Sequence, residues 1–282
     1  MIKLVECPRD AMQGWNTPIP TEKKVAYLSQ LLQVGFDTLD FGSFVSPKAI
    51  PQLADTADVL AQLPSRSKTK LLAIVANVRG VETACQFDRI ENIGFPFSIS
   101  PTFQQRNTNA TMEQSFDTVK QLQELCTKHN KKAVVYISMG FGNPYGDAYS
   151  PELAAEWVDK MNQLEIPIIA LSDTIGCSTP ENIDFLFKTL IPAFPKMEIG
   201  AHLHTTPDTW EEKVKAAYEA GCRRFDGALK GIGGCPMAAD QLTGNMPTER
   251  MIGYFQDQKI ALGLNADALQ ASIRMAQEIF AH

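Results

Sequence analysis

The sequence has no hydrophobic run long enough to cross a membrane. Its longest apolar stretch, residues 166–171, has the length of a strand, whereas a membrane-spanning helix takes about 20 apolar residues. A strand-like run begins at Ile2 without the segments of a signal peptide, and residues 280–282 match no targeting signal. We therefore expect a cytoplasmic protein with no membrane partner.

An excess of positive charge is also missing. The chain has 26 Lys and Arg against 32 Asp and Glu, a net charge of −6, and an isoelectric point near 5.3. Proteins that bind nucleic acids through the phosphates need a basic surface, so this balance argues against a nucleic-acid partner. It still allows a small anionic ligand to meet local positive charge.

Several catalytic and structural signatures are absent. The six cysteines, at positions 7, 85, 126, 177, 222 and 235, lack paired metal-ligand spacing, and a 282-residue chain can bury a core without disulfides, so we expect reduced thiols. The sequence contains no P-loop motif, and its Ser, His and Asp residues do not show the order of a hydrolase catalytic triad. The segment 231–234 lacks the glycine spacing and following helix of a phosphate-binding loop, which excludes a doubly wound dinucleotide-binding fold.

What the sequence does contain is a repeated alternation of strand and helix patterns. We expect buried strands at residues 2–6, 38–41, 71–76, 89–100, 132–139, 166–171, about 200–204 and 223–228. We expect helices at residues 20–32, 48–63, 81–87, 111–129, 150–164, 179–193, 209–220, 248–263 and 266–281. Eight units without a linker predict an α/β fold, a (β/α)8 TIM barrel with an extra C-terminal helix, as a single domain over residues 1–282.

Active sites of such barrels lie where the strands run into the loops that follow them. Polar residues at the predicted strand ends are therefore candidates for function. They are Arg9 and Asp10 after the first strand, Asp40 in the second, Asp173 and Thr174 after the sixth, His202 and His204 in the seventh, and Asn245 beyond the eighth. In a closed barrel the first, seventh and eighth strands are neighbours, so the candidates from these strands should lie together.

The segment Gly200-Ala201-His202-Leu203-His204 places two imidazoles two residues apart. Alternate residues of a strand share one face, so the two rings could hold one metal ion. Taken alone, the pair fits two ordinary polar residues at a strand end equally well. Together with Asp10 and Asn245 it predicts a divalent metal site of mixed nitrogen and oxygen ligands. Magnesium or manganese suits chelation of an oxygen-rich substrate, and the imidazoles would also accept zinc, cobalt or iron.

Arg9 and Cys235 are the other residues with chemical potential. A guanidinium beside a metal ligand can stabilise an enolate or a carboxylate, and the alternative for Arg9 is a surface salt bridge. Cys235 lies in a glycine-rich loop, where a thiol could transfer a proton. The alternative is that Cys235 packs as a small, half-buried apolar residue. For an isolated cysteine, this alternative is the favoured interpretation.

Several segments together carry a family resemblance, in family order over nearly the whole chain. They are Pro8-Arg9-Asp10 with Gln13, Ser43-Phe44-Val45-Ser46-Pro47-Lys48 with Pro51-Gln52, Asp173-Thr174-Ile175-Gly176, His202-x-His204, Gly233-Gly234-Cys235-Pro236, and Gly244-Asn245 with Thr248-Glu249. The chain resembles the 3-hydroxy-3-methylglutaryl-CoA lyases, which are metal-dependent barrels. Isopropylmalate and homocitrate synthases share the histidine pair but differ at residues 43–48 and 233–236.

The resemblance implies a retro-Claisen cleavage of (S)-3-hydroxy-3-methylglutaryl-CoA to acetyl-CoA and acetoacetate, a reaction of leucine degradation that needs no redox cofactor. The metal would chelate the C3 hydroxyl and a carboxylate oxygen, and a base would take the hydroxyl proton. The implied catalytic residues are Arg9, Cys235, Asp40 and Asp173. Arg9 would stabilise the enolate, and Cys235 would transfer protons. The implied substrate contacts are Gln13, Ser43, Thr174, Ser100, Asn107 and Asn109, with Phe103 in the same stretch and Arg106 available for a phosphate. An acyl-CoA thioester is the expected partner, and a homodimer is allowed.

The chain also departs from the family pattern around the predicted site. Asp40 stands where Glu is usual, Ala11-Met12 replace Gly-Leu, Thr205 replaces an Asp, Ala170 a Ser and Arg250 an acidic residue, and the segment between Cys235 and Asn245 has one extra residue. These changes leave open a lyase for another 3-hydroxyacyl-CoA. A Claisen-type synthase of the same barrel group is a further alternative, although 282 residues leave no room for the regulatory domain of many synthases. A non-catalytic barrel that senses a metal or an acyl-CoA is the third.

Overall fold

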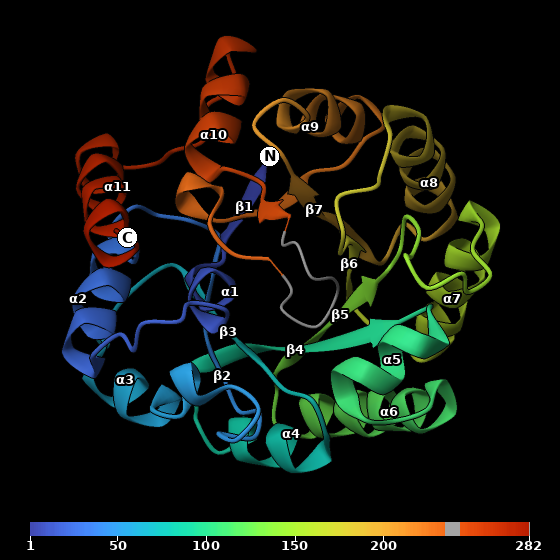
Figure 1. Cartoon of the computed structure of the whole chain (residues 1–282), viewed down its shortest axis with the longest axis horizontal. Coiled ribbons are helices and arrows are strands. Elements are labelled where there is room, and N and C mark those ends of the chain that lie inside the picture. Colours follow the sequence, from blue (N-terminus) through green and yellow to red (C-terminus); the bar gives the residue numbers. More distant parts are fainter. Residues whose placement is uncertain (235–242, 282) are drawn as a thin grey trace.

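Eight parallel strands close into a barrel at the centre of the molecule, as the repeated alternation predicts (Figure 1). The computed structural model of the protein describes residues 1–234 and 243–281. Successive strands pair with each other, and the ring closes because β8 also pairs with β1. The strands are β1 (Lys3–Glu6), β2 (Thr38–Ser43), β3 (Lys70–Ile74), β4 (Ile90–Ser98), β5 (Lys132–Ser138), β6 (Ile168–Asp173), β7 (Glu198–Thr205) and β8 (Arg224–Gly227).

Helices surround the barrel on its outside (Figure 1). Those that follow the strands are α2 (Thr21–Leu31), α3 (Thr56–Gln62), α4 (Val78–Cys85), α6 (Met112–Lys128), α7 (Pro151–Gln163), α8 (Pro180–Ala193), α9 (Trp210–Glu219) and α10 (Thr248–Asp257). The predicted extra C-terminal helix is α11 (Ala266–Ile279), which packs against α2. Within residues 1–234 and 243–281, no helix is long and apolar enough to span a membrane.

Several helices begin at a residue whose side chain caps them. Ser150 accepts a hydrogen bond from the backbone N–H of Leu153 at the start of α7. Thr111 and Thr179 form reciprocal capping boxes at α6 and α8. These side chains satisfy N–H groups that the first helical turn leaves unpaired, which is why the predicted starts of these helices agree with the structure within about two residues.

Four short elements escaped prediction, and two of them shape the barrel mouth. The segment after β1, expected to be a loop, is helix α1 (Pro8–Gln13), because Pro8 suits the first helical position. The expected strand 89–100 stops at Ser98, since Ser100 caps a further helix, α5 (Pro101–Thr108). The others are a two-residue strand, β9 (Gly244–Asn245), and the 3-10 turn η2 (Leu229–Gly231).

Two predicted helices have the wrong extent. The helix expected at residues 48–63 is divided into a 3-10 turn, η1 (Pro51–Leu53), and α3. Pro51 cannot donate the backbone hydrogen bond that a continuous helix requires at that position. The helix expected at residues 248–263 ends at Asp257, and Lys259, just beyond it, has a positive φ of 59°. A left-handed residue ends a right-handed helix, so residues 260–263 lie outside α10.

The inside of the barrel is divided between apolar and charged side chains. Six apolar side chains from β3, β5 and β6 form a cluster apart from the main core: Leu72, Ile74, Val134, Tyr136, Ile168 and Ala170. Strand β8 carries two buried charged residues, Arg224 and Asp226, which are 1% and 2% exposed. Barrel interiors are commonly filled with branched apolar residues, so the charged half needs a functional explanation.

Candidate metal and substrate site

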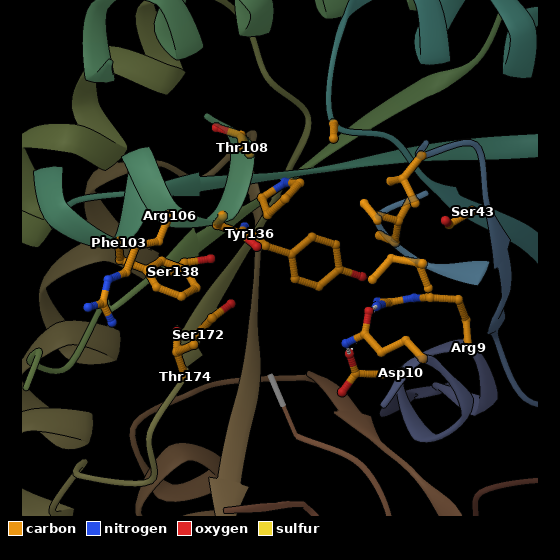
Figure 2. Close-up of a pocket in the computed structure, with 18 of the residues that line it drawn as sticks. Arg9, Asp10, Ser43, Phe103, Arg106, Thr108, Tyr136, Ser138, Ser172 and Thr174 are labelled. Carbon is orange, nitrogen blue, oxygen red and sulfur yellow. Dashed lines mark hydrogen bonds and ion pairs between the residues drawn. The ribbon is translucent and has the colours of Figure 1, made fainter. Parts of the chain in front are cut away.

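A cavity of about 440 Å³ opens at the ends of the strands, where barrel active sites lie (Figure 2). Eleven residues predicted above line it: Arg9, Asp10, Gln13, Ser43, Phe103, Arg106, Asn107, Asn109, Thr174, His202 and His204. They come from α1, β2, α5 with the residue that follows it, β7 and the loop after β6. The barrel therefore brings together side chains that are as much as 195 residues apart (Arg9 to His204, 204 − 9).

Asp10, His202 and His204 form a group that could hold a metal ion. Their ligand atoms lie within 4.8 Å of one another, and all three side chains are buried. Both histidines project from β7 because alternate strand residues share a face, while α1 carries Asp10 to them from β1. One carboxylate and two imidazoles at this spacing make a donor set for a divalent ion.

The pKa shifts of Asp10 and His204 favour a cation, whereas Asp226 raises the pKa of His202 against the effect of burial. The pKa of Asp10 is lowered, because the nearby charges of Arg9 and the histidines outweigh the effect of burial. Burial, with His202 alongside, lowers the pKa of His204 to about 4, so this ring is neutral at pH 7. Its buried Nδ1 has no hydrogen-bond partner among the described residues. A neutral imidazole with an unpaired nitrogen is what a metal ligand requires, so these residues fit the ion.

Asn245, predicted as the fourth ligand, touches the group without lining the cavity. It lies in β9, which pairs antiparallel with the end of β7 and places Asn245 opposite His204. Its Nδ2 donates to Asp10 Oδ2 at 2.8 Å and to the carbonyl of Ile232 at 2.9 Å. Rotating the amide by 180° would bring its oxygen to the same side but would lose both hydrogen bonds, since Asp10 Oδ2 and the Ile232 carbonyl are acceptors. Gly233 packs against this amide, since a Cβ there would lie 2.5 Å from Nδ2.

Arg9 is held rigidly beside the group. Its Nη1 donates to Asp10 Oδ1 and to Gln13 Oε1, each at 2.9 Å. Its Nε and Nη2 donate to Asp40 Oδ2 at 2.9 and 2.6 Å. Because the Arg9 side chain is only 8% exposed, the alternative of a surface salt bridge is wrong. Asp40 does not line the cavity, and burial raises its pKa to about 6 despite the opposing charge of Arg9.

Asp173 and Ser100 do not line the cavity either, so the structure does not place them where substrate could touch them. The Asp173 carboxylate is fully buried and accepts hydrogen bonds from Cys177 N, Ser178 N, Ser178 Oγ and Lys213 Nζ. Ser100 accepts a hydrogen bond from Phe103 N at the start of α5, and its hydroxyl donates to Asp147. Both side chains shape loops at the mouth. Cys235 lies outside the described residues.

A family model described as HMGL-like matches residues 2–275 of the chain. The chain belongs to the HMGL-like family. Hydroxymethylglutaryl-CoA lyase YngG of Bacillus subtilis is 30% identical over 271 residues, which cover 96% of this HMGL-like chain and 90% of that protein. The 3-hydroxy-3-isohexenylglutaryl-CoA/hydroxymethylglutaryl-CoA lyase of Pseudomonas aeruginosa is 29% identical over 269 residues, covering 95% and 89%.

Solved structures agree with this assignment. An HMG-CoA lyase from Acinetobacter baumannii, in complex with coenzyme A and 3-methylmalate, superposes with a TM-score of 0.93 at 29% identity, covering 100% of this chain and 92% of that one. The carboxyl transferase domain of Rhizobium etli pyruvate carboxylase, at 16% identity and a TM-score of 0.69, shares the fold alone.

Sequence reasoning missed five polar residues that line the cavity of this HMGL-like protein: Asn77, Thr108, Tyr136, Ser138 and Ser172. Tyr136 and Ser138 lie at alternate positions of β5, so they share its inward face. Figure 2 shows the Tyr136 ring pointing toward Arg9, and its buried hydroxyl has no hydrogen-bond partner among the described residues. The buried Ser43 hydroxyl also has no hydrogen-bond partner among the described residues. Both hydroxyls are available to a ligand.

Lys213 was also missed, because it lies within helix α9 rather than at a strand end. Its side chain is only 2% exposed, and Nζ donates to Asp173 Oδ2 at 2.7 Å, to the Gly176 carbonyl at 2.9 Å and to the His204 carbonyl at 3.0 Å. One ammonium group therefore joins the loop after β6 to the end of β7. The signal in the sequence is a lysine on the apolar face of a helix, next to Val214.

We expect Lys213→Met to lower the free energy of unfolding by about 3 kcal/mol, the lower end of the cost of breaking a buried ion pair. The lower end applies because Asp173 keeps its other hydrogen-bond donors. Chemical denaturation measures the change. Lys215→Met, at an exposed position of the same helix, is the control and should change stability little. Equal stability of the two variants would contradict this role of Lys213.

Proposed function

We propose that this HMGL-like protein is a hydroxymethylglutaryl-CoA lyase, which cleaves (S)-3-hydroxy-3-methylglutaryl-CoA to acetyl-CoA and acetoacetate with the help of a divalent metal ion. The observation that carries the proposal is the buried group of Asp10, His202 and His204 with Arg9 bonded to it, on the wall of the cavity. Lyases of this name match the chain over 94–96% of its length, which supports the same conclusion.

Asp10, His202 and His204 would hold the metal, with the amide oxygen of Asn245 as a fourth ligand. Magnesium or manganese is the proposed ion, and zinc is compatible with the imidazoles. When bound, the ion would acidify a substrate hydroxyl and polarise the oxygens that it chelates.

The residues of the chain supply the remaining chemistry. Breaking the C2–C3 bond leaves a thioester enolate, whose negative oxygen needs a positive partner that does not move. Arg9 is such a partner, since Asp10, Gln13 and Asp40 fix its guanidinium in three directions. The unpaired hydroxyl of Ser43 is placed to bind a substrate oxygen, with Thr174 at the opposite wall.

The CoA moiety is proposed to lie along α5 at the cavity mouth. Asn107 and Asn109 line the cavity there, and Arg106 is exposed beside them. The Arg106 guanidinium lies 4.8 Å from the centre of the Tyr145 ring, a contact that orients it. Guanidinium groups bind phosphates well, so Arg106 suits the phosphates of the nucleotide.

Incubating the purified protein with (S)-3-hydroxy-3-methylglutaryl-CoA and Mg²⁺ or Mn²⁺, and following acetoacetate, tests the proposal. A thioester with a longer substituent at C3 belongs in the same assay, because the Pseudomonas aeruginosa relative is named for both kinds of substrate. A third arm supplies acetyl-CoA with 2-oxo acids. Condensation in that arm without any acetoacetate in the first would sink the lyase assignment in favour of a synthase.

The proposal includes a proton-transfer role for Cys235. We expect Cys235→Ser to keep the fold and the metal while losing most turnover, since a hydroxyl is a far weaker acid than a thiol. Acetoacetate production and metal content measure the two effects. Cys222→Ser, at a buried thiol beneath β7, serves as the matched control. Turnover near that of wild type would make Cys235 a loop-packing residue.

The proposal also includes four predictions, on the domain organisation, the location, the pathway and the assembly of the protein. The chain would act as one catalytic domain, residues 1–282, in the cytoplasm. It would take part in leucine degradation, and it could assemble as a homodimer.

A further inference from the structure

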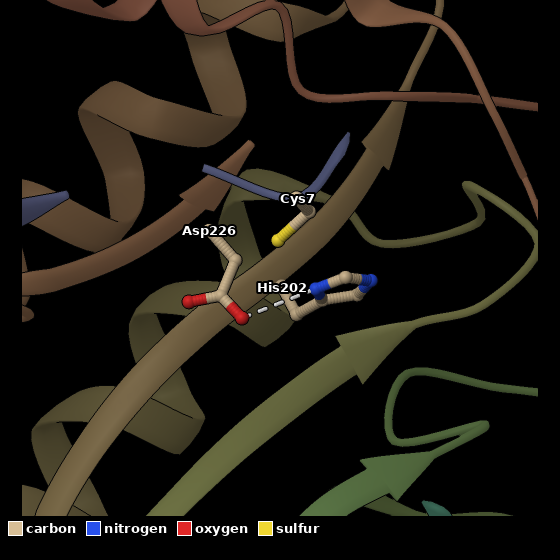
Figure 3. A group of neighbouring side chains, drawn as sticks. All are labelled: Cys7, His202 and Asp226. Carbon is tan, nitrogen blue, oxygen red and sulfur yellow. Dashed lines mark hydrogen bonds and ion pairs between the residues drawn. The ribbon is translucent and has the colours of Figure 1, made fainter. Parts of the chain in front are cut away.

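His202 is supported from below by a buried carboxylate on the neighbouring strand. Asp226 of β8 lies opposite His202 of β7 in the strand register, and its Oδ2 is 3.3 Å from His202 Nδ1 (Figure 3). The Asp226 side chain is 0% exposed. Asp226 is not among the site residues predicted from the sequence, and it does not line the cavity. The hydrogen bond that joins it to the pocket is the one to the imidazole.

Asp226 is part of a charged column inside the barrel. Arg224 Nε lies 3.7 Å from Asp226 Oδ1, and Arg224 Nη1 donates to Glu198 Oε1 at 3.3 Å. Room for the arginine comes from Gly200 on β7, where a Cβ would lie 2.7 Å from Arg224 Cδ. The order from the barrel floor upward is thus Glu198, Arg224, Asp226 and His202.

Such a column adds little to stability. Buried ion pairs lose about as much in desolvation as they gain in attraction, and apolar residues usually fill this space in a barrel. Asp226 Oδ1 and the Nε and Nη2 atoms of Arg224 also lack a full hydrogen-bond partner among the described residues. The column is therefore better explained by its effect on the histidine at its top.

We propose that Asp226 is the positioning residue of His202, and that it holds the ring so that Nε2 faces the metal ion. A carboxylate at Nδ1 keeps the proton on that nitrogen and leaves the lone pair on Nε2, which fixes both tautomer and ring orientation. Tyr136 restricts the same ring by an edge contact, with centroids 5.4 Å apart and planes at 84°. The inference rests on the metal site of the proposed function.

The two histidines are therefore unequal. His202 has an anionic partner, whereas His204 Nδ1 has no hydrogen-bond partner within the described residues. Thr205, which stands where the family resemblance expects an acidic residue, donates instead to the Asn245 carbonyl at 3.3 Å. Asp226 thus determines which ring nitrogen of His202 is left for the metal, whereas no described side chain bonds Nδ1 of His204 in this way.

Cys7 offers a competing arrangement. Its thiol, a ring nitrogen of His202 and a carboxylate oxygen of Asp226 also lie within 4.8 Å of one another (Figure 3). A thiophilic ion bound there would use Asp226 as a ligand rather than as support. Cobalt distinguishes the two arrangements, because a Co²⁺–thiolate bond gives a charge-transfer band in the near ultraviolet and a site of imidazoles and carboxylates does not.

Metal binding to Asp226→Asn tests the proposal. We expect Mn²⁺ to bind this variant about 10–100-fold more weakly than wild type by calorimetry, the usual cost of losing a residue that supports a ligand. Glu6→Gln is the matched control, since Glu6 is equally buried but bonds to Leu229 N and Thr248 Oγ1, away from the ligands. Wild-type affinity in a folded Asp226→Asn protein, or an equal loss in Glu6→Gln, would overturn the proposal. So would a cobalt–thiolate band that Cys7→Ser removes.

A second measurement needs no variant at Asp226. The chain has only four histidines, so ¹⁵N spectra of histidine-labelled wild type can assign the His202 tautomer, with His202→Gln to identify its signals. The proposal expects the proton on Nδ1, and a proton on Nε2 overturns it. If wild type binds no Mn²⁺, the proposed function fails. If wild type binds and the tautomer or the variant disagrees, only this inference fails.

Discussion

Replacing Arg9 by glutamine is expected to lower kcat on (S)-3-hydroxy-3-methylglutaryl-CoA by about 10²–10³-fold, the cost of removing one donor from an oxyanion site. Arg9 lines the cavity and touches the metal group through Asp10, so its charge lies where an enolate would form. Its contacts with Asp40 prevent it from turning away. Glutamine keeps polarity but loses the charge and the forked geometry.

The Arg9 variant must be separated from simple misfolding. Removing the guanidinium would leave the fully buried Asp40 carboxylate without its ionic partner, and burial already raises the Asp40 pKa to about 6. In the double variant Arg9→Gln with Asp40→Asn, an amide of the same shape replaces the carboxylate. We expect the double variant to regain stability in chemical denaturation without regaining kcat.

Arg274→Gln, an exposed arginine on α11 far from the mouth, controls for loss of charge alone and should retain wild-type kcat. Steady-state kinetics on metal-saturated protein provide the comparison. If the folded Arg9→Gln protein keeps kcat within about tenfold of wild type, less than one oxyanion donor supplies, Arg9 does not stabilise the enolate.

Replacing His204 by alanine is expected to remove the metal and the turnover together. The ring is neutral at pH 7 because burial lowers its pKa to about 4, and its Nδ1 has no other use among the described residues. Losing a direct ligand should weaken Mn²⁺ binding by more than about 100-fold, the upper limit for losing a supporting residue. His129→Ala, at an exposed position after α6, is the matched control.

Calorimetry with Mn²⁺, acetoacetate production and acyl-CoA binding are measured on the same His204→Ala preparation. If the protein is a non-catalytic sensor of acyl-CoA, the ligand binds normally and biological output survives without the metal. If it is an enzyme, biological output is lost together with metal binding. Retention of wild-type Mn²⁺ affinity would exclude His204 as a ligand in either case.

The parts of the fold and site that were predictable depend on local periodicity and on one rule of barrel geometry. Strand and helix patterns alternate clearly, and polar residues at strand ends must converge once the ring closes. That reasoning finds Asp10, His202 and His204, which the barrel does bring together. It also finds Arg9, although the turn that carries it is a helix rather than a loop.

The remaining features depend on contacts between elements that no local pattern records. Asp173 satisfies the strand-end rule, yet α9 packs Lys213 against it and its carboxylate faces away from the cavity. Asp226 lies in the middle of β8 and matters only because the register places it opposite His202. Ser100 has a cap-forming side chain that the expected strand concealed.

The three hydrogen bonds of Lys213 also have a dynamic consequence. A single ammonium group binds the backbone of Gly176 after β6 and of His204 in β7, so these two parts of the rim cannot shift independently. Motions of the loop that carries Thr174 must then be shared with a metal-group histidine, and both are transmitted to the outer helix α9. Substitutions on the outer surface of that helix can therefore alter the motions of the cavity walls without touching any residue that lines the cavity.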